Sequence, residues 1–95
     1  MTISTIQDAL VPVLKEYGVR KAVLFGSYAT GCANEQSDVD LLVDSGLKGL
    51  AFTGLMEDVF EKLNKSVDIL DITHIIKGSH IEHEIKQTGV TIYEA

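Results

Sequence analysis

The chain carries Leu24-Phe25-Gly26-Ser27 and, a little further on, Ser37-Asp38-Val39-Asp40-Leu41-Leu42-Val43, and these two stretches decide its fold. Successive strand residues point to opposite faces. The second stretch therefore predicts a strand with Asp38 and Asp40 on one face and apolar side chains on the other. Two carboxylates held side by side repel each other unless a cation lies between them. The pattern predicts a metal site close to a Gly-Ser turn.

A third carboxylate, Asp68, lies in Val67-Asp68-Ile69-Leu70, where alternation turns it away from the two buried branched residues. If this strand pairs beside Val39–Val43, three carboxylates converge on one site from two neighbouring strands. Mg²⁺ prefers oxygen ligands, and two such ions can serve the attacking oxygen and the leaving group of a phosphoryl transfer. We therefore expect Asp38, Asp40 and Asp68 to be both metal ligands and catalytic residues.

The Gly26-Ser27 turn predicts a phosphate-binding element. A glycine directly after a buried strand lets the backbone approach a ligand closely. The amides of the helical turn that follows, Tyr28 to Gly31, would point toward phosphate oxygens, and the Ser27 hydroxyl can donate a further hydrogen bond. Together with the carboxylates, this turn indicates a metal-bound nucleoside triphosphate as the ligand.

Elsewhere, helical and strand patterns alternate along the chain. Apolar periodicity predicts helices that end at Gly18 and Gly89 and a further helix over Leu50 to Leu63. The expected strands are Lys21 to Phe25, Val39 to Val43, Val67 to Leu70 and an edge strand at Val90 to Tyr93. The order α-β-β-α-β-α-β predicts an α/β (α+β) fold: a small mixed sheet with helices packed mainly on one face.

Two capping boxes mark helix starts, Ser4 with Gln7 and Ser79 with Glu82. Pro12 removes a backbone donor from the first helix, so we expect a kink or a late start there. In the helix over Leu50 to Leu63 the apolar residues recur as one stripe, which predicts that they pack in the core. The stripe consists of Phe52, Leu55, Met56, Val59, Phe60 and Leu63.

Composition narrows the class of protein. The 95 residues fit one domain, residues 1–95, with 45% hydrophobic and 23% charged side chains. A net charge of −6 argues against direct nucleic-acid binding, which needs clustered Lys and Arg. No apolar run suits a membrane span or a signal peptide, and one cysteine fits a reducing compartment, so we expect a cytoplasmic protein.

With these motifs in place, the chain resembles the minimal nucleotidyltransferases of the DNA polymerase beta superfamily. The resemblance covers most of the chain. It rests on the Gly26-Ser27 turn, the spaced Asp38 and Asp40, and Asp68 in a Val-Asp-Ile-Leu context. The end of the chain, from Gly89 to Tyr93, also matches the Gly-Val-x-x-Tyr end of the family.

The resemblance implies roles for these residues. Gly26 and Ser27 would bind the triphosphate of ATP, Asp38 and Asp40 would bind two Mg²⁺ ions, and Asp68 would be the third carboxylate, binding or deprotonating the acceptor hydroxyl. The chain departs from the family at Thr30, where many members carry Arg. That change removes a fixed cation that could stabilise triphosphate charge.

The resemblance also implies a function. Minimal domains of this family are commonly antitoxins that neutralise a HEPN-domain ribonuclease toxin by adenylylating a tyrosine. The resemblance thus implies transfer of AMP from Mg-ATP to a hydroxyl of such a partner. Two alternatives stay open: an antitoxin that neutralises its partner by complex formation with a weak or dead site, and a plain Mg²⁺- or Ca²⁺-binding domain. The sequence leaves the acceptor, the nucleotide base and a homo-oligomer open.

Other polar residues have simpler interpretations. Asp71, close to Asp68, is expected to cap the segment that follows it. His80 and His83 lie one helical turn apart and could bind a transition metal, but a solvated helix face is the preferred interpretation. Cys32 has no partner in the sequence that would activate it, so we expect a passive loop residue.

Overall fold

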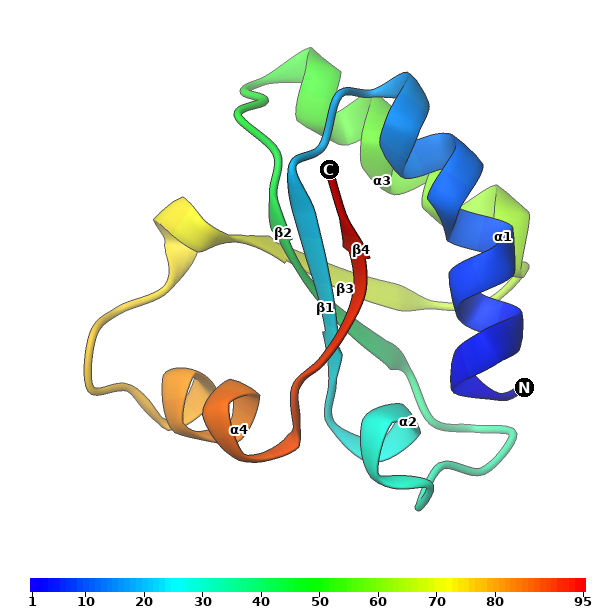
Figure 1. Cartoon of the computed structure of the whole chain (residues 1–95), viewed down its shortest axis with the longest axis vertical. Helices are drawn as coiled ribbons and strands as arrows, with labels where there is room; N and C mark the ends of the chain where they lie inside the picture. The colour runs from blue at the N-terminus through cyan, green and yellow to red at the C-terminus, as the bar shows by residue number, and fades with distance from the viewer.

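A computed structural model describes all 95 residues of the chain (Figure 1). The elements follow one another as α1 (Ile3–Glu16), β1 (Lys21–Phe25), α2 (Ser27–Thr30), β2 (Val39–Asp44), α3 (Leu50–Leu63), β3 (Val67–Asp71), the 3₁₀ turn η1 (Ile72–His74), α4 (His80–Thr88) and β4 (Val90–Glu94). This order matches the alternation expected from the sequence, including the helical turn after Gly26-Ser27, with η1 as an added element. None of the helices combines the length and apolar character that crossing a bilayer demands.

The four strands form one mixed sheet in the order β3-β2-β1-β4. Strand β1 pairs antiparallel with both β2 and β4, whereas β2 and β3 run parallel. Parallel neighbours need a crossover, and α3 supplies it. The predicted pairing of the Asp68 strand beside Val39–Val43 is confirmed by the parallel pairing of β2 with β3. The two outer strands, β3 and β4, are the free edges of the sheet.

The two long helices, α1 and α3, pack side by side on one face of the sheet (Figure 1). The side chains of β2 alternate between the two faces of the sheet. Val39, Leu41 and Val43 are fully buried beneath the helices, and Asp40 and Leu42 between them are half-buried. Each fully buried Leu or Val contributes about 1.5–3 kcal/mol. The short helix α4 lies away from the α1–α3 layer and has no buried residue of its own. Helices therefore cover mainly one face, as predicted.

The start of α1 differs from the prediction. Thr2, not Ser4, caps the helix, and its side chain accepts a hydrogen bond from the Thr5 amide. Gln7 instead donates from Nε2 to the Ile92 carbonyl, over 2.7 Å, and so ties α1 to β4. The expectation of a late start at Pro12 was wrong, because α1 begins at Ile3 and continues through that residue.

The apolar stripe of α3 is only partly core. Leu55, Val59 and Leu63 are buried, but Met56 and Phe60 leave 40% and 50% of their surface exposed. The three buried residues are spaced four apart and so lie in one row along the helix. Met56 and Phe60 each follow a buried residue, and successive residues are rotated by about 100° around the helix axis. With a single helical layer nothing covers that second row. The prediction that Met56 and Phe60 pack in the core was therefore wrong.

The end of β3 is fixed by Asp71, which is buried and caps η1 as predicted. Its carboxylate accepts hydrogen bonds from the Ser45 hydroxyl at 2.6 Å and from the Thr73 amide at 3.1 Å. Burial alone would raise the pKa of Asp71, but these hydrogen bonds outweigh burial and lower it to about 2. The contact joins the ends of β2 and β3, and so holds the register of the two strands that carry the candidate site.

Candidate active site

Asp40 and Asp68 face each other across the two parallel strands. The register pairs Asp40 of β2 with Asp68 of β3. Neighbouring strands lie about 4.8 Å apart, and both side chains stand on the face that α1 and α3 leave uncovered. Asp38 precedes β2 in irregular backbone and is exposed. The structure thus brings Asp40 and Asp68 together as the sequence predicted. Asp38, which was expected on the same strand as Asp40, instead precedes that strand.

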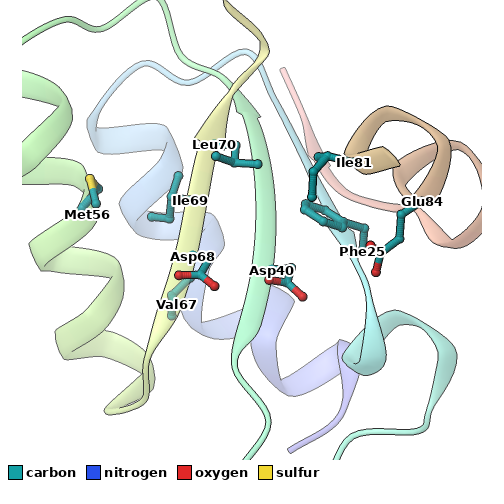
Figure 2. Close-up of a pocket in the computed structure, with 9 residues that line it drawn as sticks. All are labelled: Phe25, Asp40, Met56, Val67, Asp68, Ile69, Leu70, Ile81 and Glu84. Carbon is teal, nitrogen blue, oxygen red and sulfur yellow. The ribbon is translucent and has the colours of Figure 1, made fainter. Parts of the chain in front are cut away.

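A fourth carboxylate, Glu84 of α4, joins this group, and sequence reasoning missed it. Asp40, Asp68 and Glu84 line one cavity of about 320 Å³ together with Phe25, Ile81 and apolar residues of α3 and β3 (Figure 2). Glu84 lies one helical turn after Ile81, an apolar residue of α4 that lines the same cavity. That spacing was the signal that could have found it.

The electrostatics of the cavity centre on Asp40. Burial raises the pKa of Asp40 above its ordinary value, and the negative charge of Asp68 raises it further. Glu84 and Asp38 add smaller contributions in the same direction. No Lys or Arg lines the cavity to offset these effects on Asp40, because its titratable side chains are the three carboxylates alone.

Gly26 begins the turn after β1 and lies directly against Asp40. Its backbone angles, φ 76° and ψ −152°, belong to a region that is open essentially to glycine alone. A Cβ atom placed on Gly26 would overlap Oδ2 of Asp40. Glycine is therefore required here for two reasons, the conformation and the close approach, and the turn predicted to bind phosphate touches the central carboxylate.

The Gly26 amide is itself held by α4. It donates a hydrogen bond of 3.0 Å to Oγ1 of Thr88, and that hydroxyl donates in turn to the Glu84 carbonyl, over 2.9 Å. Thr88 is therefore a second residue that the sequence did not single out. One helical turn of α4 thus supplies Glu84 to the cavity and fixes the position of the glycine beside Asp40.

The residues after Gly26 form the short helix α2. The Gly26 carbonyl accepts hydrogen bonds from the Ala29 and Thr30 amides, which leaves the Ser27 and Tyr28 amides ahead of the first helical hydrogen bond. The Ser27 hydroxyl makes no hydrogen bond within the chain and is available to a ligand. Thr30, where the family resemblance implied an Arg, donates a hydrogen bond to the Ser27 carbonyl at 3.2 Å and adds no positive charge.

The donor set suits a hard cation such as Mg²⁺. All the titratable side chains that line the cavity are carboxylates, and oxygen is the ligand that Mg²⁺ prefers. No three His, Cys, Asp or Glu side chains lie close enough together to enclose an ion by themselves. Substrate phosphates and water commonly complete such a site. His80, His83 and Cys32 are exposed and line no part of this cavity.

The sheet, the glycine turn and the paired carboxylates define the class of small nucleotidyl-transferring proteins, and sequence comparison identifies the family. The family model described as "Polymerase beta, Nucleotidyltransferase" matches residues 8–95. A relative from Methanocaldococcus jannaschii, provisionally named protein adenylyltransferase MJ0435, is 38% identical over 77 residues, which are 79% of this chain and 83% of the relative. The chain therefore belongs to the polymerase beta nucleotidyltransferase family and is an enzyme of that class.

A second curated relative is the protein adenylyltransferase MntA of Thermococcus cleftensis. It is 46% identical over 48 residues, which are 46% of this chain and 48% of the relative. This shorter match agrees with the family assignment.

Solved structures share the fold. A structure provisionally described as a minimal nucleotidyltransferase aligns with a TM-score of 0.76 at 25% identity, covering 95% of each chain. A toxin-antitoxin structure with AMP-PNP also gives 0.76, at 21% identity, covering 94% of this chain and 73% of that one. The MNT antitoxin in complex with a tri-AMPylated HEPN toxin of Shewanella oneidensis gives 0.71 at 18% identity, covering 99% and 74%.

Proposed function

We propose that this enzyme transfers AMP from Mg-ATP to a tyrosine hydroxyl of a HEPN-domain toxin and so acts as the antitoxin. The observation that carries the proposal is the register of Asp40 opposite Asp68, with the Gly26 turn packed directly against Asp40. That arrangement sets a phosphate-binding turn beside a carboxylate pair. It is the geometry that transfer from a metal-bound triphosphate needs.

Each residue has a separate role in this proposal. Asp38 and Asp40 hold two Mg²⁺ ions with Asp68 as the third carboxylate, and Gly26 and Ser27 bind the triphosphate. When bound, Mg²⁺ supplies positive charge against the triphosphate and the departing pyrophosphate. The absence of Lys and Arg from the cavity lining supports this proposal, because the protein offers no cation of its own for that purpose.

The chemical step is a displacement at the α-phosphorus of ATP. The acceptor oxygen forms a bond to that phosphorus, the bond to the bridging oxygen of pyrophosphate breaks, and the hydroxyl proton passes to Asp68. Asp68 suits the role of base because it is exposed on the free-edge strand, where an acceptor from another protein can reach it.

A protein is the acceptor that fits this chain best. We propose that residues 1–95 act as a single domain in the cytoplasm. Two curated relatives carry the name of protein adenylyltransferase, and solved neighbours of the same fold are antitoxins in complex with HEPN toxins. These comparisons support a HEPN-domain partner.

The test uses labelled ATP, Mg²⁺ and the HEPN protein of the same organism. We expect label to pass from the α-phosphate to the HEPN protein with the wild type, and transfer to fall at least 10²-fold in Asp40→Asn and Asp68→Asn. Asp8→Asn is the matched control, since Asp8 is an exposed carboxylate on α1, remote from the cavity. Absence of label with the wild type, or full transfer by Asp40→Asn, would refute the proposal.

The second candidate is an antitoxin that works by occlusion alone. It is favoured by the neutral Thr30, which supplies no fixed cation to stabilise triphosphate charge. Calorimetry with Mg-ATP separates the two functions, because occlusion requires no nucleotide. If Asp40→Asn still neutralises the toxin as fully as the wild type, occlusion is the mechanism.

A further inference from the structure

An exposed groove runs along α3 and the start of β3. We call it the α3 groove, and it has a volume of about 450 Å³. Its lining residues are Thr53, Met56, Glu57, Phe60, Glu61 and Val67. Met56 and Phe60 are 40% and 50% exposed, and they are the two members of the α3 stripe that no part of this chain covers. Large adjoining apolar side chains left open on a small protein commonly mark a binding surface.

The α3 groove is continuous with the active-site cavity. Met56 and Val67 line both, so the two hollows meet at the free edge of β3. Figure 2 shows Met56 on α3 beside β3, with Asp68 on that strand and Asp40 on the next. A segment lying in the α3 groove would therefore reach Asp68 before any other carboxylate of the site.

The strand order places the proposed nucleotide donor and the proposed acceptor at different ends of the site. The proposed triphosphate turn at Gly26 follows β1, in the middle of the sheet, and Asp68 stands on the outer strand β3. On the donor side the cavity is walled by Glu84 and Ile81 of α4. On the β3 side it opens into the α3 groove. The acceptor has its open approach from that side.

The charge of the α3 groove specifies its occupant. The charged side chains that line it are Glu57 and Glu61, and no Lys or Arg lines it. Carboxylates at a rim select a partner that presents Lys or Arg there, and they disfavour an acidic partner. The surface therefore combines an apolar floor with an acidic border.

We propose that the α3 groove binds the acceptor segment of the partner protein, a proposal that rests on the function proposed above. An apolar side chain of that segment packs on Met56 and Phe60. Lys or Arg side chains of the same segment pair with Glu57 and Glu61. The tyrosine hydroxyl is thereby held beside Asp68. The α3 groove thus sets which tyrosine is modified, whereas the Gly26 turn and the carboxylates bind the donor.

The test measures binding of the HEPN protein without nucleotide or Mg²⁺, by calorimetry. We expect Phe60→Ser to weaken binding at least tenfold, as loss of a central apolar anchor does. The matched control is Leu50→Ser on the same helix, about 15 Å away along its axis and 89% exposed, which leaves binding unchanged. Glu57→Lys should weaken binding more than Asp8→Lys, a charge reversal of equal size on α1.

A second measurement separates this inference from the proposed function. Phe60→Ser should raise the KM for the HEPN protein and leave the affinity for Mg-ATP unchanged. If the wild type binds the HEPN protein through Phe60 but transfers no AMP, the proposed function fails and the docking surface stands. Equal binding by wild type and Phe60→Ser overturns the inference. So does a wild-type dimer that Phe60→Ser converts to a monomer, because a second copy would then occupy the groove.

Discussion

Replacing Gly26 by alanine should disable the site while leaving the fold in place. The added methyl group would overlap Oδ2 of Asp40, so this carboxylate has to turn away from the position it occupies beside the phosphate turn. An ordinary contact begins at 3.4 Å from the new Cβ. Asp40 must therefore move by on the order of 1 Å, a displacement of the kind that lowers reaction rates by about 10²-fold.

Gly49→Ala is the matched control for backbone strain. Gly49 has φ 57° and ψ −130°, close to the 76° and −152° of Gly26, so both alanines enter the same unfavourable region. Each should lower the free energy of unfolding by about 1–3 kcal/mol. Nothing lies within 4 Å of a Cβ on Gly49, so that variant carries the strain without the displaced carboxylate.

Two measurements decide the matter. Urea denaturation gives the free energy of unfolding of each variant. Transfer of labelled AMP measures the activity of each variant, and calorimetry with Mg²⁺ and AMP-PNP measures its affinity for nucleotide. We expect similar destabilisation in both variants and loss of transfer in Gly26→Ala alone. If Gly26→Ala binds nucleotide and transfers AMP as well as Gly49→Ala does, then the contact between Gly26 and Asp40 does not position the site.

Three further changes test other parts of the structure. Thr88→Val leaves the Gly26 amide without its acceptor and should lower the free energy of unfolding by about 1–2 kcal/mol, whereas Thr88→Ser should restore it; urea denaturation checks both. Asp71 has a pKa lowered to about 2 in the folded state, below its unfolded value. It should therefore stabilise the wild type above about pH 4, and denaturation from pH 7 to 2 should show that stabilisation fading as the pH falls, with a shallower loss in Asp71→Asn. Pro12→Ala should raise the midpoint of thermal unfolding, because it returns an amide to the interior of α1 at an exposed position, with a gain of about 1–3 kcal/mol; an unchanged midpoint would mean that the helix accommodates the ring without strain.

Where local patterns are strict, the sequence predicted the fold closely. The strand Lys21–Phe25 and the helix Leu50–Leu63 have the bounds that were expected. The strand is apolar and ends at a glycine, and the helix has a regular apolar period. The local sequence therefore determines the bounds of both elements. The start of α1 could not be chosen in the same way. Thr2, Ser4 and Thr5 are all good capping residues, and the Gln7 side chain expected to pair with Ser4 is bonded to the Ile92 carbonyl of β4 instead.

In the candidate site too, local sequence predicted some features, and tertiary packing determined the others. Alternation in the two strands placed Asp40 and Asp68 on one face, and the register agrees. Asp38, expected on the same strand as Asp40, precedes it. Glu84 was missed because the position of α4 over the sheet depends on tertiary packing. The exposure of Met56 and Phe60 was missed for a related reason. Apolar periodicity reports which residues share a helix face, but it does not report whether another layer covers that face.

The hydrogen bond from Gly26 to Thr88 has a consequence for local stability. Helix α4 has no buried residue, so it should open at a lower free energy than the sheet on which it lies. Each opening of α4 releases the Gly26 amide, although Gly26 directly follows a central strand. Amide hydrogen exchange at Gly26 should therefore follow the opening of α4 and not global unfolding. A nucleotide bound across this turn would slow that exchange, and the substrate would thereby order the least stable part of its own site.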